Sequence, residues 1–122
     1  VEPEGFDDVA RSLAAGAVRV NNRMAGSICD AILTPSPNAR TFAILRELCG
    51  PGIVVSDEDA MRAMTAAYVR LKIVLEPGGA VALAAALFHR DDDRDVIVVA
   101  SGGNVDAPVF RKAIDSYAGH FD

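Results

Sequence analysis

The stretch that decides the fold is residues 96–104, which reads Val-Ile-Val-Val-Ala-Ser-Gly-Gly-Asn. The β-branched apolar run at residues 96–100 is typical of a strand buried on both faces of a parallel sheet. It ends in a Ser-Gly-Gly-Asn turn, and Asp106 and Pro108 then indicate that a helix begins. A strand, a glycine turn and a helix in this order are how open α/β sheets present groups to a ligand. We therefore predict a ligand site at Ser101, at the carboxyl end of a strand.

Residues 52–55 form the second run that is typical of a buried strand. Because buried strands need parallel neighbours, which two strands cannot supply for themselves, the expected sheet is incomplete. We predict an α/β fold with an incomplete, open and mostly parallel sheet flanked by helices, and residues 1–122 as a portion of a larger domain. Helices are expected at residues 7–15, 41–48, 56–75, 79–88 and 107–117.

Two of these helices carry clear local signals. Ser56 followed by Asp59 is arranged like a capping box, in which two side chains satisfy the free N–H groups of the first turn. Apolar residues then recur at helical spacing from Met61 to Leu75. The run at residues 79–88 is apolar all round, which indicates a helix that is buried on every side.

The composition narrows the class of protein. A net charge of -5 argues against nucleic acid or an anionic membrane as a partner. No apolar run reaches about 18 residues, so no membrane span is expected. Cys29 and Cys49 lack metal-type spacing and fit reduced thiols in a cytoplasmic protein. Because a hydrophobic content of 51% is high for so short a chain, we expect apolar surface that meets another part of the domain or another subunit.

Taken alone, Ser-Gly-Gly-Asn is also typical of an ordinary tight turn, but three further segments accompany it. They are Glu-Pro-Gly-Gly-Ala at residues 76–80, Ser-Ile-Cys-Asp-Ala at residues 27–31, and four carboxylates within residues 2–8. Together, in this order and spacing, they resemble the carboxyl-terminal part of the fold-type II pyridoxal-phosphate enzymes, whose fold is tryptophan-synthase-β-like. The threonine/serine dehydratase and serine racemase branch is the most similar, over residues 2–117.

The resemblance implies pyridoxal 5'-phosphate as cofactor. Ser101 would hydrogen-bond the pyridine nitrogen, and a hydroxyl carries no charge that would hold this nitrogen protonated. The ring is then a weaker electron sink, which suits expulsion of a β-hydroxyl. Gly102 and Gly103 would let the backbone approach the ring, while Asn104 would contact the cofactor or only brace the turn. Glu76 would lie near the ring, or cap the helix that follows or form a salt bridge.

The same resemblance implies a divalent cation at the acidic start of the chain. Glu2 and Asp8 would supply carboxylate oxygens and Phe6 its carbonyl, a hard donor set that suits Mg²⁺ or Ca²⁺. The alternative is a solvated acidic helix start. Asp30 resembles a residue at the edge of the substrate pocket, and structural support of its loop is an equal alternative.

The lysine that such enzymes bond to the cofactor is not expected in this chain. Lys72 and Lys112 lie in amphipathic helices and are interpreted as solvated charges. The family's Ser-x-Lys-x-Arg-Gly-like motif and its glycine-rich phosphate cradle are not found in residues 1–122. We therefore expect no catalytic residue here, and the amino-terminal half of the same enzyme as the partner that supplies the lysine.

The expected function is that of the carboxyl-terminal fragment of a pyridoxal-phosphate-dependent threonine/serine dehydratase. The parent enzyme would convert a small hydroxy amino acid to a 2-oxo acid and ammonia, as a homodimer or tetramer, and the isolated chain would be inactive. Two alternatives stay open. The first is a serine racemase or another fold-type II activity, and the second is a non-catalytic fragment that binds a partner through an apolar sheet edge.

Overall fold

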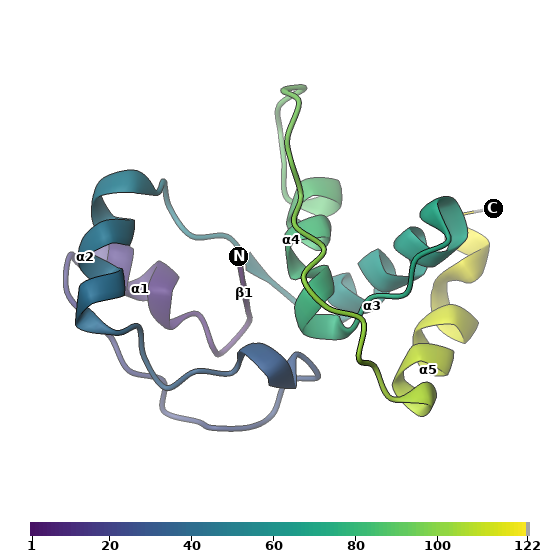
Figure 1. Ribbon diagram of the computed structural model, residues 1–122, viewed down its shortest axis with the longest axis horizontal. Helices are drawn as coiled ribbons and strands as arrows, with labels where there is room; N and C mark the ends of the chain where they lie inside the picture. The colour runs from purple at the N-terminus through teal and green to yellow at the C-terminus, as the bar shows by residue number, and fades with distance from the viewer. Residues whose placement is uncertain (122) are drawn as a thin grey trace.

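The computed structural model describes residues 1–121 and is mostly helical (Figure 1). Helices α1 and α2 lie together on one side, and α3, α4 and α5 pack together on the other, with the strands between the two groups. The regular elements are β1 (Glu2–Pro3), α1 (Asp8–Ala15), α2 (Ala39–Leu48), β2 (Val54–Val55), α3 (Asp57–Ala66), α4 (Pro77–Phe88) and α5 (Ala107–Tyr117). None of the helices in this described part is long and apolar enough to cross a bilayer.

The sheet is a parallel pair, β1 beside β2, with Glu2 opposite Val54 and Pro3 opposite Val55. The strand expected at residues 52–55 is thus confirmed in its second half. The strand expected at residues 96–100 is wrong, because this segment is extended chain without strand pairing in the described structure. A strand exists only with a hydrogen-bonded neighbour.

The segment at residues 96–100 also departs from the expected burial. Ile97 is 97% exposed and Val99 is 67% exposed. The open parallel sheet of the prediction is therefore reduced to two short strands, and the apolar run that would have been its centre lies at the surface. What is confirmed is a parallel pair flanked by helices.

The helices follow their local signals closely. Helix α5 has the predicted bounds, and α1 begins one residue later than expected. Helix α2 begins earlier, at Ala39, because the Asn38 side chain accepts a hydrogen bond from the N–H of Arg40 at 2.9 Å and caps it. Helix α4 begins at Pro77, in the first turn, where a missing N–H costs nothing.

The helix predicted to reach Leu75 ends earlier. The α-helical part, α3, stops at Ala66, and a π-helical turn continues to Leu71. Lys72 then adopts a left-handed conformation with φ of 60°, which ends the helix as a glycine usually would. Leu75 is buried, but it contributes to the core from beyond the helix.

The core lies where α3, α4 and α5 meet. It is built largely from alanines, whose small side chains let the helices approach closely, around the fully buried side chain of Met64. At the edge of this core, Tyr68 packs edge-on against Phe110 with ring centroids 5.3 Å apart. Such aromatic pairs add to the stabilisation that burial provides.

The predicted capping box is present, and its Asp59 carboxylate also contacts two further side chains. The Ser56 hydroxyl accepts from the N–H of Asp59 at 3.0 Å, and the Asp59 carboxylate accepts from the N–H of Ser56 at 3.3 Å. The same carboxylate lies 2.9 Å from Nε2 of His89, which follows α4, and 3.2 Å from Arg62. Asp59 therefore joins the start of α3 to the end of α4.

We expect Asp59→Ala to lower the free energy of unfolding by about 1–2 kcal/mol at neutral pH. Burial opposes ionisation of Asp59, but hydrogen bonds from His89 and Ser56 outweigh it and lower its pKa from the ordinary 3.8. A lowered pKa means that the stabilisation is full above the unfolded-state pKa and is lost as the pH falls through the folded-state value. Chemical denaturation from pH 7 to pH 2.5 measures this difference.

The control is Asp93→Ala, which removes the same charge from an exposed loop. Asp93→Ala should change the unfolding free energy by less than about 0.5 kcal/mol. A deficit of Asp59→Ala that stayed constant down to pH 2.5 would contradict the assignment.

Candidate functional site

The structure brings together two of the predicted motifs. The turn at residues 101–104 crosses the segment that leads into α4, and the N–H of Glu76 donates to the carbonyl of Gly102 at 3.0 Å. The N–H of Val105 donates to the carbonyl of Gly103 at 3.0 Å, at the end of this segment. The motifs that resemble the family in combination are therefore in direct contact.

Glycine is required on both sides of this crossing. A Cβ on Gly79 would lie 2.5 Å from the carbonyl oxygen of Gly102, and one on Gly103 would lie 2.7 Å from the carbonyl oxygen of Val74. A Cβ on Gly102 would collide with the carboxylate of Glu76. The glycines thus allow two segments of this chain to approach each other, whereas Gly102 and Gly103 were predicted to let the backbone approach the cofactor.

The side chains expected at the cofactor and the substrate lie around this turn. Ser101 is exposed, next to the crossing. Asn104 and Asp30, which come from distant parts of the sequence, line one small cavity of about 160 Å³. Asp106 and Pro77 line it as well, together with Ile28, Val105 and Val109. The predicted pocket-edge residue is therefore beside the predicted cofactor turn.

At the acidic start of the chain, Glu2 binds the first turn of α1. Its carboxylate accepts from the N–H of Val9 at 2.9 Å and from the N–H of Ala10 at 2.7 Å. A carboxylate at a helix N-terminus is stabilised by the free N–H groups and by the helix dipole. Burial outweighs these two hydrogen bonds and raises the pKa of Glu2.

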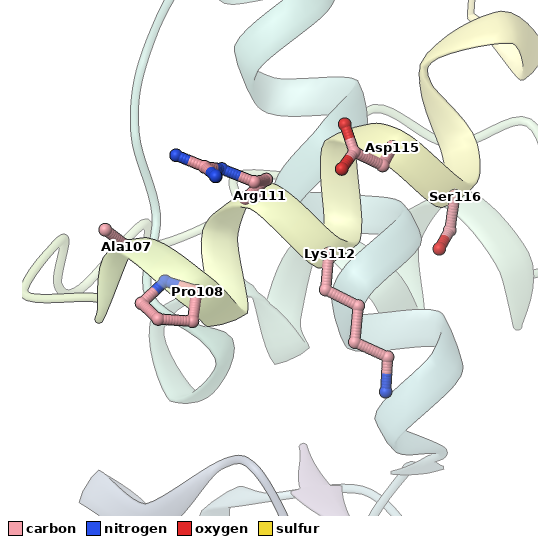
Figure 2. A pocket seen from close by; sticks show the side chains of 6 residues that line it. All are labelled: Ala107, Pro108, Arg111, Lys112, Asp115 and Ser116. Atoms are coloured by element: carbon pink, nitrogen blue, oxygen red, sulfur yellow. The ribbon is translucent and has the colours of Figure 1, made fainter.

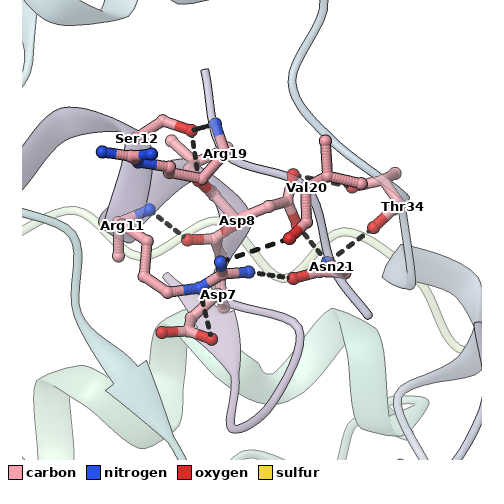
Figure 3. Close-up of polar contacts among 11 residues, drawn as sticks. Asp7, Asp8, Arg11, Ser12, Arg19, Val20, Asn21 and Thr34 are labelled. Carbon is pink, nitrogen blue, oxygen red and sulfur yellow. Dashed lines mark hydrogen bonds and ion pairs between the residues drawn. The ribbon is translucent and has the colours of Figure 1, made fainter. Parts of the chain in front are cut away.

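Asp8 is fully buried and connects α1 to the loops around it (Figure 3). Its carboxylate accepts from Nδ2 of Asn21 at 2.6 Å and from the hydroxyl of Thr34 at 3.4 Å. Its backbone carbonyl accepts from the hydroxyl of Ser12 at 2.5 Å, and this hydroxyl accepts from the N–H of Arg19 at 2.7 Å. The cluster fastens the chain that follows α1 back onto that helix.

This arrangement bears on the predicted cation site. The carboxylates of Glu2 and Asp8 are both engaged by donors from the protein, and Phe6 is 1% exposed. Within residues 1–121 no group of three or more His, Cys, Asp or Glu side chains could hold a metal ion. Donors from the protein thus occupy both carboxylates, and the cation at Glu2, Phe6 and Asp8 stays a prediction.

Other reactive side chains lie outside the turn. Lys72 is exposed and its Nζ donates to the carbonyl of Val69 at 2.7 Å. Lys112 points outward from α5 and lines a shallow hollow on the face of that helix (Figure 2). Burial raises the pKa of the Cys29 thiol to about 11, which keeps it protonated at neutral pH. The hollow is formed by Ala107, Pro108, Arg111, Lys112, Asp115 and Ser116.

Comparison with known proteins shows the family to which the chain belongs. The family described as pyridoxal-phosphate dependent enzyme (PALP) matches residues 1–104. The serine racemase of Dictyostelium discoideum is 34% identical over 119 residues, which cover 93% of this chain and 36% of that protein. The catabolic L-threonine dehydratase of Escherichia coli (strain K12) is 32% identical over 110 residues, covering 87% of this chain and 33% of that protein.

Solved structures show the same relationship. A threonine deaminase from T.th. superposes with a TM-score of 0.79 at 37% identity, covering 85% of this chain and 38% of that one. Maize serine racemase superposes with a TM-score of 0.78 at 33% identity, covering 98% of this chain and 38% of that one. The chain belongs to the fold-type II pyridoxal-phosphate-dependent enzymes, in the serine racemase and threonine dehydratase branch. It spans about a third of the length of the curated relatives it matches.

The residues at the turn fit one end of the cofactor. The exposed hydroxyl of Ser101 can donate a hydrogen bond to the pyridine nitrogen. It lies next to the close approach of Gly79 and Gly102, where a side chain on either glycine would collide with the chain. The roles of Gly102, Gly103, Asn104 and Glu76 toward the cofactor stay predictions. Their contacts within the chain already account for their positions.

Proposed function

We propose that this chain is the carboxyl-terminal part of a dehydratase that acts on L-threonine, L-serine or a related hydroxy amino acid. The observation that carries the proposal is the contact between Glu76 and Gly102, which joins the two motifs next to the exposed Ser101. When bound, pyridoxal phosphate supplies the electron sink that lets the substrate lose its Cα proton and its β-hydroxyl. The product enamine takes up water and releases a 2-oxo acid and ammonia.

Ser101 has the central role in this proposal. Its neutral hydroxyl orients the ring nitrogen without holding it protonated, which suits elimination. Asp30 borders the substrate pocket, and its place in the same cavity as Asn104 supports this assignment. The lysine and the phosphate cradle come from the amino-terminal half of the same enzyme.

The exposed apolar run at residues 96–100 supports that partner. Apolar side chains such as Ile97, which is 97% exposed, favour contact with further protein over contact with water. We propose that the amino-terminal half covers this run. The same surface would serve the alternative function, that of a non-catalytic fragment that binds a partner.

Serine racemase is the second candidate function. Serine racemases and threonine dehydratases are both among the similar proteins, at comparable identity. Both reactions begin with removal of the Cα proton, and they differ in whether the proton returns or the β-hydroxyl departs. Incubation with L-serine distinguishes them, because the dehydratase forms pyruvate and the racemase forms D-serine.

Reconstitution tests the proposal. We expect the isolated 122-residue chain to show no turnover and no visible absorbance from bound cofactor. Co-expression with the amino-terminal half of the enzyme should restore both, together with release of ammonia from L-threonine or L-serine. Turnover by the isolated chain would contradict the proposal. Recovery of a stable complex that binds no cofactor would favour the non-catalytic fragment.

A further inference from the structure

We infer that Gly79 is a positioning residue for Ser101, an inference that rests on the proposed function. Gly79 lies in the first turn of α4, and it is buried. Its role follows from the crossing with the turn at residues 101–104, because this crossing sets how far the turn stands from the helix.

The space at Gly79 is closed by backbone rather than by movable side chains. A Cβ there would lie 2.5 Å from the carbonyl oxygen of Gly102 and 2.8 Å from its nitrogen. Ordinary van der Waals contact begins at about 3.4 Å. A methyl group at residue 79 therefore requires that one of the two segments move by about 1 Å.

The turn is the segment that moves. Helix α4 is held by the core, where Ala80 and Ala84 are completely buried. Three residues of the turn, Ser101, Gly103 and Asn104, are exposed, and the hydrogen bond from Glu76 to Gly102 links the turn to the start of α4. Displacement of the turn consequently costs less free energy than displacement of the helix.

Movement of Gly102 reaches the hydroxyl of Ser101 through one peptide unit. Hydrogen bonds need a donor–acceptor distance of roughly 2.5–3.2 Å, so a shift of about 1 Å is enough to weaken or break one. The absence of a side chain at residue 79 thus fixes the place from which Ser101 can reach the ring nitrogen.

The neighbouring glycine supplies a matched control. A Cβ on Gly78 would meet side-chain atoms of Ala31 and Ile32 at 3.5 Å, which is ordinary contact. Gly78→Ala and Gly79→Ala add the same methyl group to the same turn of the same helix and gain the same helix propensity. They differ in whether the methyl group meets the turn.

The experiment uses the full-length enzyme loaded with pyridoxal phosphate. The absorbance and fluorescence spectra of the bound cofactor and its dissociation constant are measured for Gly78→Ala, Gly79→Ala, Ser101→Ala and the double variant Gly79→Ala/Ser101→Ala. We expect Ser101→Ala to shift the spectrum and weaken cofactor binding about three- to tenfold. Gly79→Ala should shift the spectrum in the same direction, the double variant should add nothing to Ser101→Ala, and Gly78→Ala should retain the spectrum of the parent.

The outcomes separate the inference from the function on which it rests. A parental spectrum for Gly79→Ala, or effects that multiply in the double variant, would overturn the inference and leave the proposed function intact. An unchanged spectrum for Ser101→Ala would overturn the contact that the proposed function assigns to Ser101. If Gly79→Ala does not fold, Gly103→Ala takes its place. A Cβ on Gly103 would lie 2.7 Å from the carbonyl oxygen of Val74, so this variant should displace the same turn and shift the spectrum in the same direction.

Discussion

Replacing Met64 with alanine is expected to lower the free energy of unfolding by about 2–5 kcal/mol. The Met64 side chain is completely buried, and the neighbouring core positions are occupied by alanines such as Ala60 and Ala84, which have no spare volume to fill the cavity. The loss equals a large part of the stability of an ordinary domain, about 5–15 kcal/mol. Denaturant titration followed by circular dichroism measures it.

Met24→Ala is the matched control, because Met24 is 66% exposed and its truncation leaves no cavity. Its effect should stay below about 0.5 kcal/mol. Equal effects of the two substitutions would show that the packing of α3 against α4 does not determine the stability of this chain.

Ser101→Asp in the full-length enzyme is expected to reduce the rate of elimination about 100-fold. A carboxylate beside the ring nitrogen would hold this nitrogen protonated, which makes the ring a stronger electron sink. Loss of the β-hydroxyl is favoured by the weaker electron sink that the neutral Ser101 hydroxyl provides. Ser101 is exposed in this chain, so the larger side chain does not enter the core formed by α3, α4 and α5. Formation of 2-oxo acid and the absorbance of the bound cofactor are measured together.

Ser116→Asp adds the same charge on the outer face of α5 (Figure 2), and Ser116 is exposed as well. Its rate and spectrum should equal those of the parent enzyme. If Ser101→Asp also retained the parental rate and spectrum, the hydroxyl of Ser101 would not face the ring nitrogen.

Local signals predicted most of the helical structure. Helix α5 has the bounds expected from Asp106 and Pro108, and the capping box of α3 is formed by Ser56 and Asp59 as predicted. These features depend on hydrogen bonds and steric limits within a few residues of the chain. The end of α3 was less predictable, because a left-handed Lys72 gives no sequence signal comparable to glycine.

The sheet and the acidic start could not be predicted in the same way. The apolar run at residues 96–100 has the composition of a buried strand, but a composition cannot supply the neighbouring strand. Glu2 and Asp8 have the chemistry of cation ligands, yet their carboxylates accept hydrogen bonds from α1 and from Asn21. Which donors face a carboxylate depends on the path of chain segments that are distant in sequence.

The Ser-Gly-Gly-Asn segment shows which features follow from the local sequence and which depend on tertiary contacts. By itself the sequence determined helix α5 after this segment, the apolar helix α4 and the family, because local signals and the order and spacing of the motifs carry that information. Only the tertiary structure decided that Gly79 and Gly102 touch, that β2 pairs with β1, and that Asp30 reaches the cavity of Asn104. The reason is that backbone approach and strand pairing are relations between distant segments, which local propensities do not encode.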